Sequence, residues 1–280
     1  MANAERGETD EPAAMRDRRG PEQHASDSFA TELAPMTSLG IDPRGGWAFL
    51  FDIDGTLLDL ADHPDRVVVP ETLLPALRRL KALAGGALAL VTGRGLGSAD
   101  RLFGADFDCA GNHGATLRLG TTLDAVAAAD DLLLDGIATA LEPAIAAYPG
   151  AWIERKSHSV AVHWRRVPEA AGDLARAVRI AVAGHVRDWR LIQGKGVIEI
   201  ARRDATKGTA VERLLASPGY AGRRPFYAGD DVTDEDAFQA VAGLGGVGVL
   251  VGPPRRTYAQ YSCPAPEVFR RWIEALVEDA

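Results

Sequence analysis

Two aspartates, Asp52 and Asp54, stand two residues apart at the end of the apolar run WAFLF, and Gly-Thr follows them. Three more acids, Asp230, Asp231 and Asp234, follow a second apolar stretch, PFYAG. Carboxylates that meet at one edge of a sheet raise one another's pKa unless a cation joins them. Mg²⁺ suits such a cluster, because it takes few carboxylates, keeps waters and accepts a substrate phosphate. Zn²⁺ is not expected, since the cluster contains neither cysteines nor grouped histidines.

The spacing of Asp52 and Asp54 lets both carboxylates approach one cavity, because alternate residues of a strand face the same side. One carboxylate could attack a phosphorus atom, and the other could protonate the leaving group and later activate water. Thr92, after the run ALALV, offers a hydroxyl, and Lys207, at a predicted helix start, offers a cation. Together they fit hydrolysis of a phosphate monoester, a very slow reaction that needs both charge neutralisation and positioning.

Each of these features also has a structural interpretation. A DIDGT stretch alone is often a solvated turn, and the acids of GDDVTDED could simply favour a helix N-terminus through the helix dipole. Thr92-Gly93-Arg94 alone is a weak signal, and a lone Lys207 is more often a surface lysine. All four features occur here at strand ends or helix starts, and this combination favours the catalytic interpretation.

The elements that position these residues follow an alternating pattern from Gly46 onward. WAFLF and ALALV are typical of buried strands, and PETLLPALRRLKALAGG between them has leucines at helical spacing. Apolar strands that alternate with helices predict a parallel sheet covered on both faces. We therefore expect an α/β fold with a Rossmann-like parallel sheet, whose ligands bind beyond the carboxyl ends of the strands.

The middle of the chain has a different, α+β pattern. Two helical stretches, at about 130–148 and 168–185, each precede a pair of short strands. We interpret residues 115–201 as an inserted cap domain, and residues 46–114 and 202–280 as the catalytic core domain. Residues 1–45 carry mixed charges and few large apolar groups, so burial would not offset their ordering entropy. We expect them to form a disordered tail.

The composition of the chain excludes several classes of protein. The chain has 280 residues, 46% apolar and 25% charged, with a net charge of −8. This is enough for a full core, and the acidic balance argues against nucleic-acid binding. No apolar run reaches the roughly 18 residues of a membrane span. Cys109 and Cys263 form neither a disulfide framework nor a metal motif. We therefore expect a cytoplasmic monomer with a small-molecule substrate and no membrane partner.

DIDGT, VTGR, Lys207 and GDDVTDED resemble the four motifs of the haloacid dehalogenase superfamily of phosphohydrolases. The resemblance implies that Asp52 is the nucleophile and Asp54 the acid/base. It also implies that Mg²⁺ is held by Asp52, the main-chain carbonyl of Asp54 and Asp230, with support from the nearby Asp231 and Asp234. The inserted segment lies where this superfamily carries its larger α+β cap.

The stretches GNHG, ERKSHSVAVHWR, GKGVIEI and YAGDDVTDEDAF resemble, more narrowly, the trehalose-6-phosphate phosphatase family. The resemblance spans about residues 47–280. It implies a set of cap residues that grip the sugar phosphate: Glu154, Lys156, Arg165, Lys195 and Glu199. Arg94 and His113 are added as substrate contacts, although His113 is equally well explained by a structural hydrogen bond in its loop. Thr116 and Leu117 depart from the family, which often has an acid soon after HG.

Strand alternation agrees with this assignment. Glu154 and Lys156 share one face of a predicted strand, and Lys195 and Glu199 share one face of another. Apolar residues such as Val162 alternate with these polar positions, so one sheet face would be charged and the other apolar. A solvated sheet face with surface ion pairs would give the same pattern.

The sequence therefore predicts a Mg²⁺-dependent phosphatase that hydrolyses trehalose 6-phosphate through an aspartyl-phosphate. A related enzyme acting on sucrose phosphate or mannosyl-phosphoglycerate is one alternative, and a substrate panel would separate the two. A non-catalytic module that binds phosphosugars is an alternative of another class. It predicts saturable binding without release of phosphate.

Overall fold

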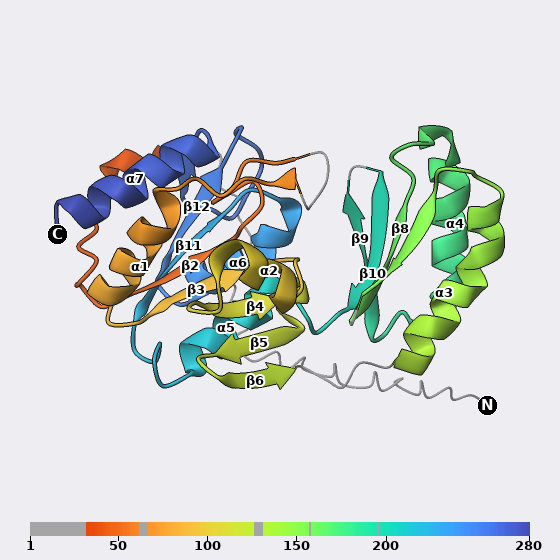
Figure 1. Cartoon of the computed structure of the whole chain (residues 1–280), viewed down its shortest axis with the longest axis horizontal. Coiled ribbons are helices and arrows are strands. Elements are labelled where there is room, and N and C mark those ends of the chain that lie inside the picture. The colour runs from red at the N-terminus through yellow and green to blue at the C-terminus, as the bar shows by residue number, and fades with distance from the viewer. Residues whose placement is uncertain (1–31, 62–65, 126–130, 157, 195) are drawn as a thin grey trace, which may run out of the picture.

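The computed structural model describes residues 32–61, 66–125, 131–156, 158–194 and 196–280. Two sheets organise these residues, and Figure 1 shows each sheet with its own helices. The helices are α1 (Leu73–Leu83), α2 (Leu96–Phe103), α3 (Asp131–Ala146), α4 (Ala171–Ala181), α5 (Lys207–Ala216), α6 (Glu235–Gly243) and α7 (Pro266–Glu278). The short 3-10 helices are η1 (Met36–Ser38), η3 (Asn112–Gly114), η4 (Pro168–Ala170), η5 (Ala183–His185) and η6 (Val232–Asp234).

The larger sheet has nine strands in the order β1-β13-β12-β11-β2-β3-β4-β5-β6. Its strands are β1 (Ala34–Pro35), β2 (Trp47–Phe51), β3 (Leu88–Val91), β4 (Asp108–Gly111), β5 (Thr116–Leu119), β6 (Thr122–Ala125), β11 (Arg224–Gly229), β12 (Val247–Val251) and β13 (Tyr261–Cys263). From β1 to β4 every pairing is parallel, while β5 and β6 add an antiparallel edge. The predicted parallel sheet is confirmed.

Helices cover both faces of this sheet because its strands are apolar on both sides. Phe49 and Phe51 of β2 pack into a cluster with α1, α2 and α7, whereas Ala48 and Leu50 pack with α5 and α6 on the other face. Figure 1 shows α1 and α7 on one side of the sheet and α5 and α6 on the other. Strand β2 lies between β3 and β11, so its carboxyl end lies centrally at one edge of the layer.

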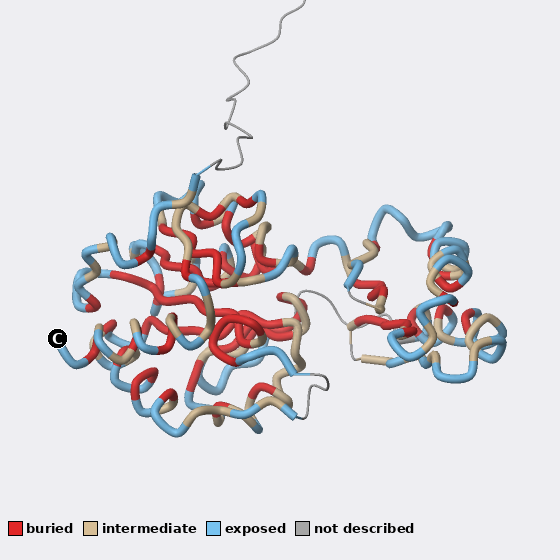
Figure 2. The backbone as a smooth tube through the Cα atoms, turned by 90° about the horizontal axis from the view of Figure 1, so that it is seen from above, coloured by how far each residue is buried: buried red, intermediate tan, exposed pale blue. Residues whose placement is uncertain are grey.

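The smaller sheet is antiparallel, with the order β7-β8-β10-β9. Its strands are β7 (Trp152–Arg155), β8 (Ser159–His163), β9 (Trp189–Gly194) and β10 (Val197–Arg202). Val160, Val162 and Ile200 are buried against α3 and α4, and those helices lie on the side of the sheet away from the larger domain (Figure 1). Figure 2 shows two separate groups of buried residues, one in each sheet. We refer to the smaller unit as the cap.

Two features differ from the sequence prediction. Within the expected disordered tail 1–45, β1 pairs with β13, and Met36 is buried in the core cluster, so the prediction is wrong for this part. Residues 1–31 lie outside the described residues. The predicted boundary at residue 115 separates β5 and β6 from the large sheet to which they are hydrogen-bonded. Sheet membership places the boundary after Ala125.

None of the helices built from the described residues has both the length and the apolar content that crossing a bilayer requires.

Candidate active site

Asp52 directly follows β2, the central strand, and is buried. Its carboxylate accepts a hydrogen bond of 2.8 Å from the ammonium of Lys207, which also donates to Asp234 at 2.7 Å. All three side chains are almost fully buried. The predicted nucleophile and the predicted lysine therefore lie in direct contact.

Lys207 reaches this position because α5 begins at it. Thr206 caps the helix, accepting a hydrogen bond from the amide of Thr209 and donating its own amide to the Thr209 hydroxyl. Such a reciprocal cap fixes where a helix starts. The sequence places Lys207 in the first turn, and the fold turns that end of α5 toward the end of β2.

Asp234 is held by four donors. One of its oxygens accepts from Lys207 and from the Tyr227 hydroxyl at 2.5 Å, and the other accepts the amides of Asp230 and Asp231 at 3.0 and 2.9 Å. Four donors fix the orientation of this carboxylate. Asp234 thus ties the loop after β11 to α5, and its expected support of a metal stays a prediction. Asp231 itself is exposed.

Asp230 comes close to Asp52 because residue 55 has no side chain. Gly55 has φ +82°, and a Cβ there would overlap the Asp230 carboxylate. The Thr56 hydroxyl lies between the two acids, 3.5 Å from one oxygen of each. Gly55 and Thr56 are therefore part of the site. Gly55 leaves room for the Asp230 carboxylate, and the Thr56 hydroxyl is a polar neighbour of both Asp52 and Asp230.

The electrostatics show an excess of negative charge. Burial raises the pKa of Asp52 well above its ordinary value; Lys207 opposes this, and the charge of Asp234 adds to it. Burial and the charge of Asp234 raise the pKa of Asp230 to about 7. Burial disfavours the charged Lys207, but Asp234 and Asp52 outweigh it and keep its pKa above the ordinary range. One lysine does not balance the carboxylates around it.

This donor set fits a divalent cation. Oxygens of Asp52, Asp230 and Asp234 all lie within 4.8 Å of one another, and hard cations such as Mg²⁺ prefer carboxylate and carbonyl oxygens. Each oxygen of Asp234 accepts two hydrogen bonds from the protein, whereas Asp52 and Asp230 accept fewer. Asp52 and Asp230 are therefore the better carboxylates for a metal. The expected contribution of the Asp54 main-chain carbonyl stays a prediction.

Asp54 is half-buried and faces Arg94 rather than the lysine. Both Asp54 oxygens accept from the guanidinium, each at 2.6 Å, in a fork-to-fork arrangement that fixes both planes. Ser98 of α2 accepts a further hydrogen bond from Arg94 at 3.2 Å. Thr92 is buried at the end of β3, and its hydroxyl accepts the Arg94 amide at 3.1 Å. The Thr92-Gly93-Arg94 turn therefore orients the predicted acid/base.

His113 connects this side of the core to the cap. Its backbone has φ +55°, which is uncommon for a residue with a side chain, and its ring lies where a Cβ on Gly93 would be. Its Nε2 lies 3.7 Å from a Glu199 oxygen of β10. A structural contact between domains is thus observed for His113; its predicted substrate contact stays a prediction.

Glu199 is the centre of a polar network on the cap face that looks toward the core. It accepts hydrogen bonds from Lys156 at 3.0 Å and from Ser159 at 2.5 Å. Burial alone would raise the pKa of Glu199, but His113, Lys156 and Ser159 together hold it well below its ordinary range. The carboxylate is therefore charged and oriented. Two of the five predicted cap residues, Lys156 and Glu199, are in direct contact.

The other three predicted cap residues are Glu154, Arg165 and Lys195. Glu154 accepts from His163 on the neighbouring strand at 2.9 Å, and this hydrogen bond lowers its pKa. Arg165 is exposed beyond the end of β8. Lys195 lies outside the described residues.

Sequence reasoning missed several supporting residues: Thr56, Ser98, Ser159 and Tyr227. Thr56 and Tyr227 flank the acid motifs, and their positions beside DIDG and GDD are the signals that could have found them. Ser159 has the same strand parity as His163, and that parity could have placed it on the polar face. Ser98 gives no comparable signal.

Comparisons with known proteins agree with this geometry. The family described as trehalose-phosphatase matches residues 50–265. A probable trehalose-phosphate phosphatase of Sinorhizobium fredii is 44% identical over 234 residues, covering 82% of this chain and 87% of that protein. The trehalose-6-phosphate phosphatase of Escherichia coli is 35% identical over 231 residues, covering 82% and 86%.

A solved structure has the same fold. The C-terminal domain of the Candida albicans trehalose-6-phosphate phosphatase superposes with a TM-score of 0.72 at 23% identity, covering 83% of this chain and 92% of that one. A haloacid dehalogenase sugar phosphatase superposes with a TM-score of 0.55 at 16% identity, covering 81% and 97%. The matched family spans both acid motifs and the lysine between them. The chain therefore belongs to the trehalose-phosphatase family and is a phosphoric monoester hydrolase, and it has the fold of a haloacid dehalogenase core with a cap domain.

Proposed function

We propose that this enzyme hydrolyses trehalose 6-phosphate to trehalose and phosphate, with Mg²⁺, through an aspartyl-phosphate on Asp52. The observation that carries the chemistry is the buried pair of Asp52 and Lys207, 2.8 Å apart, with Asp230 beside it. A carboxylate at a strand end with a fixed cation next to it can meet a phosphate there. The choice of substrate is supported by the relatives named above, whose own names specify this ester.

The reaction has two displacements at phosphorus. A carboxylate oxygen of Asp52 attacks, the bond from phosphorus to the sugar oxygen breaks, and the carboxyl of Asp54 gives that oxygen its proton. Asp54 then removes a proton from water, whose oxygen attacks the aspartyl-phosphate and releases phosphate and free Asp52. Lys207 and Thr92 hold phosphoryl oxygens. Bound Mg²⁺ would supply positive charge that neutralises these oxygens.

Arg94 prepares Asp54 for both proton transfers. The two bonds of 2.6 Å fix the plane of the carboxylate. An arriving phosphate would draw the guanidinium toward its own oxygens. Arg94 therefore has a predicted substrate contact and an observed contact with the acid/base.

The cap supplies recognition of the sugar. Glu199, which lies beside His113 of the core, and Lys156 present a fixed carboxylate and an ammonium, and such charged groups can hydrogen-bond sugar hydroxyls. We assign the same role to Glu154, Arg165 and Lys195. We also assign the domains accordingly, with the core in two chain segments and the cap between them. Closure over the sugar would exclude bulk water.

The experiment that tests this function measures phosphate release from trehalose 6-phosphate, glucose 6-phosphate and sucrose 6-phosphate, with and without Mg²⁺. Wild type is compared with Asp52→Asn and with Asp59→Asn as a matched control. Asp59 lies in the same stretch, but its side chain is 70% exposed and pairs with Arg270. We expect Mg²⁺-dependent release from the trehalose ester that Asp52→Asn abolishes and Asp59→Asn retains.

The possible results separate the alternatives. Release from sucrose 6-phosphate instead would keep the mechanism and replace the substrate. Binding of trehalose 6-phosphate without release of phosphate by wild type would favour the non-catalytic module. Substantial turnover by a folded Asp52→Asn variant would rule out Asp52 as the nucleophile.

A further inference from the structure

Arg190, on β9 of the cap, lies on the same sheet face as Glu199. In the antiparallel pairing of β9 and β10, Arg190 is opposite Ala201, and Ile192 is opposite Glu199. Directly opposite residues share a face, and so do alternate residues of one strand. The Arg190 side chain therefore extends on the side that looks toward the core, two register positions from Glu199.

The guanidinium of Arg190 reaches out of the cap. It donates to Asp236 of α6, a core helix, at 3.1 Å, and to the main-chain carbonyl of Ala205 at 3.1 Å. The arginine is only partly exposed, with 20% of its side chain accessible. One side chain thus ties together the cap sheet, a core helix and the chain segment between them.

That segment, residues 203–206, is the return crossing from the cap to the core. It follows β10 and leads directly into α5, whose first residue is Lys207. Arg202, the last residue of β10, forms a two-point ion pair with Asp204 at 2.8 and 2.7 Å. The amide of Arg203 donates to the main-chain carbonyl of Asp188 in the cap at 2.8 Å. The crossing is anchored on the cap side by these bonds and on the core side through Arg190.

The core partner is itself firmly placed. Asp236 lies two residues after Asp234, the acid that holds Lys207, and a Cβ on Gly208 would overlap its main-chain carbonyl. Helices α5 and α6 are in close contact here, and only a glycine permits it. Asp236 therefore keeps a fixed position relative to the catalytic cluster. Any movement of the cap relative to Asp236 is also a movement relative to that cluster.

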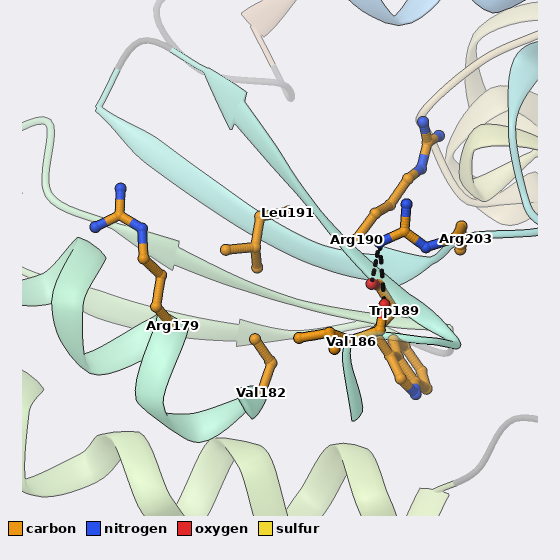
Figure 3. A pocket seen from close by; sticks show the side chains of 7 residues that line it. All are labelled: Arg179, Val182, Val186, Trp189, Arg190, Leu191 and Arg203. Atoms are coloured by element: carbon orange, nitrogen blue, oxygen red, sulfur yellow. Dashed lines mark hydrogen bonds between the residues drawn. The ribbon is translucent and has the colours of Figure 1, made fainter. Parts of the chain in front are cut away.

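Figure 3 shows how Arg190 differs from its neighbours. A groove of about 330 Å³ lies on the cap beside β9, and Leu191, Arg190 and the exposed Arg179 are among the residues that line it. Arg203 bonds back to main-chain carbonyls of the cap. Arg190 extends away from Leu191, on the opposite side of the strand, toward the core. Arg179 therefore offers a matched control: an arginine at the same groove, on the cap's own helix α4.

We propose that Arg190 is a positioning residue that sets the orientation of the cap over the active site by holding Asp236 and the Ala205 carbonyl at once. This inference rests on the proposed function, in that the cap must recognise the sugar. It goes beyond that function because Arg190 touches neither substrate nor reacting atoms. Loss of the tie would let the β9–β10 hairpin, and Glu199 with it, change its position relative to Asp52.

The consequence depends on substrate size. A phosphosugar has to meet both the catalytic acids and the cap face, and a misplacement of about 1 Å can reduce rates by up to about 100-fold. A small aryl phosphate such as p-nitrophenyl phosphate has no sugar for the cap to hold. Arg190→Gln should therefore raise KM for the phosphosugar by roughly tenfold and leave hydrolysis of the aryl phosphate within about twofold of wild type.

The experiment compares wild type, Arg190→Gln, Asp236→Asn, the double variant and the control Arg179→Gln with both substrates. If Arg190 acts through Asp236, the double variant will lose little more than either single variant. Hydrogen exchange of the amides of residues 203–206 gives a readout that does not need turnover. It should be faster in Arg190→Gln than in wild type or Arg179→Gln.

The outcomes are distinct. Equal losses on both substrates, or unchanged KM with unchanged amide exchange, would overturn the proposal for Arg190. Losses in the double variant that equal the sum of the single losses would remove Asp236 as the partner. Failure of wild type to release phosphate from trehalose 6-phosphate would instead contradict the proposed substrate. In that event the exchange measurement still decides whether Arg190 holds the crossing.

Discussion

Asp54 and Arg94 form a two-point ion pair at the ends of the neighbouring strands β2 and β3, with both contacts at 2.6 Å. The pair sets Asp54, the proposed acid/base, apart from Asp52, the proposed nucleophile. Asp52 is buried and bound to a buried lysine. Asp54 is bound to Arg94, and 32% of the Asp54 side chain is exposed. The two aspartates of one motif thus have different partners and different access to water, as two different chemical roles require.

Arg94→Lys should lower kcat by roughly 10- to 100-fold, because a lysine keeps the charge but not the planar fork that holds both oxygens of Asp54. Steady-state kinetics with and without saturating Mg²⁺ would measure it. Arg101→Lys, in helix α2 just after the Arg94 turn and exposed, is the matched control and should match wild type. Wild-type kcat in Arg94→Lys would show that the two-point contact does not matter for turnover.

Lys207→Met should abolish turnover and destabilise the fold by about 3–5 kcal/mol, because it leaves Asp52 and Asp234 buried without their cation. Urea unfolding followed by circular dichroism would measure the loss. Lys81→Met removes a lysine that hydrogen-bonds the carbonyl of Asp106 near the surface, and should cost about 1 kcal/mol or less. Similar losses of stability in both variants would contradict a special contribution from the buried ion pairs of Lys207 with Asp52 and Asp234.

Gly55→Ala should abolish Mg²⁺-dependent activity, because a Cβ at residue 55 overlaps the carboxylate of Asp230. Gly46→Ala is the control, since Gly46 has a similar φ of +77° but open space around it. Both substitutions carry the left-handed backbone cost of about 1–2 kcal/mol. Phosphate release and thermal unfolding should be measured on both variants, because backbone strain lowers stability in both whereas displacement of Asp230 lowers activity only in Gly55→Ala. An active Gly55→Ala variant would mean that Asp230 can shift without loss of activity.

Glu199 contributes a stabilisation that depends on pH. Its folded-state pKa lies below the ordinary value of 4.5, so the contribution is present above pH 4.5 and is lost as pH falls below it. Wild type should therefore be more stable than Glu199→Gln at pH 7, and the difference should shrink as pH falls through 4.5. Urea unfolding of both proteins from pH 7 down to about pH 3 tests this. A difference that grows on acidification would reverse the assigned sign.

The two cysteines should be unreactive in the folded protein. Both side chains are buried, and burial raises the pKa of Cys109 to about 12. A thiol reacts as its thiolate, so an aromatic disulfide reagent at pH 8 should label neither residue until urea is added. Rapid labelling of one thiol per native chain would show that one cysteine is accessible.

The positions proposed as catalytic were predictable because they lie at the ends of elements that the sequence marks clearly. Apolar runs identify β2, β3 and β11, and their carboxyl ends meet at one edge of any parallel sheet. Asp52, Thr92 and Asp230 were thus expected together before any coordinates. The cap face was predictable for the same reason, since strand parity separates Glu199 from Ile198 and Ile200.

Other features depend on partners far away in the chain. The pairing of β1 with β13 and the burial of Met36 need residues more than two hundred positions later, so local composition suggested a tail. The hairpin of β5 and β6 has strands of four residues, too short for a clear pattern, and the predicted domain boundary fell before it. The link between Arg190 and Asp236 leaves no local signal, because neither residue reveals the other.

The order of strands in the large sheet has a consequence for synthesis of the protein. Asp52 and Lys207, which touch, are 155 residues apart in sequence, and β2 pairs with β11, which is made after the whole cap. Contacts with such long sequence separation form late and slowly. The cap is one continuous segment with an antiparallel sheet and its own apolar cluster. We expect the cap to fold first, on the ribosome. Until β11 has been synthesised, one edge of β2 stays unpaired and is prone to aggregation.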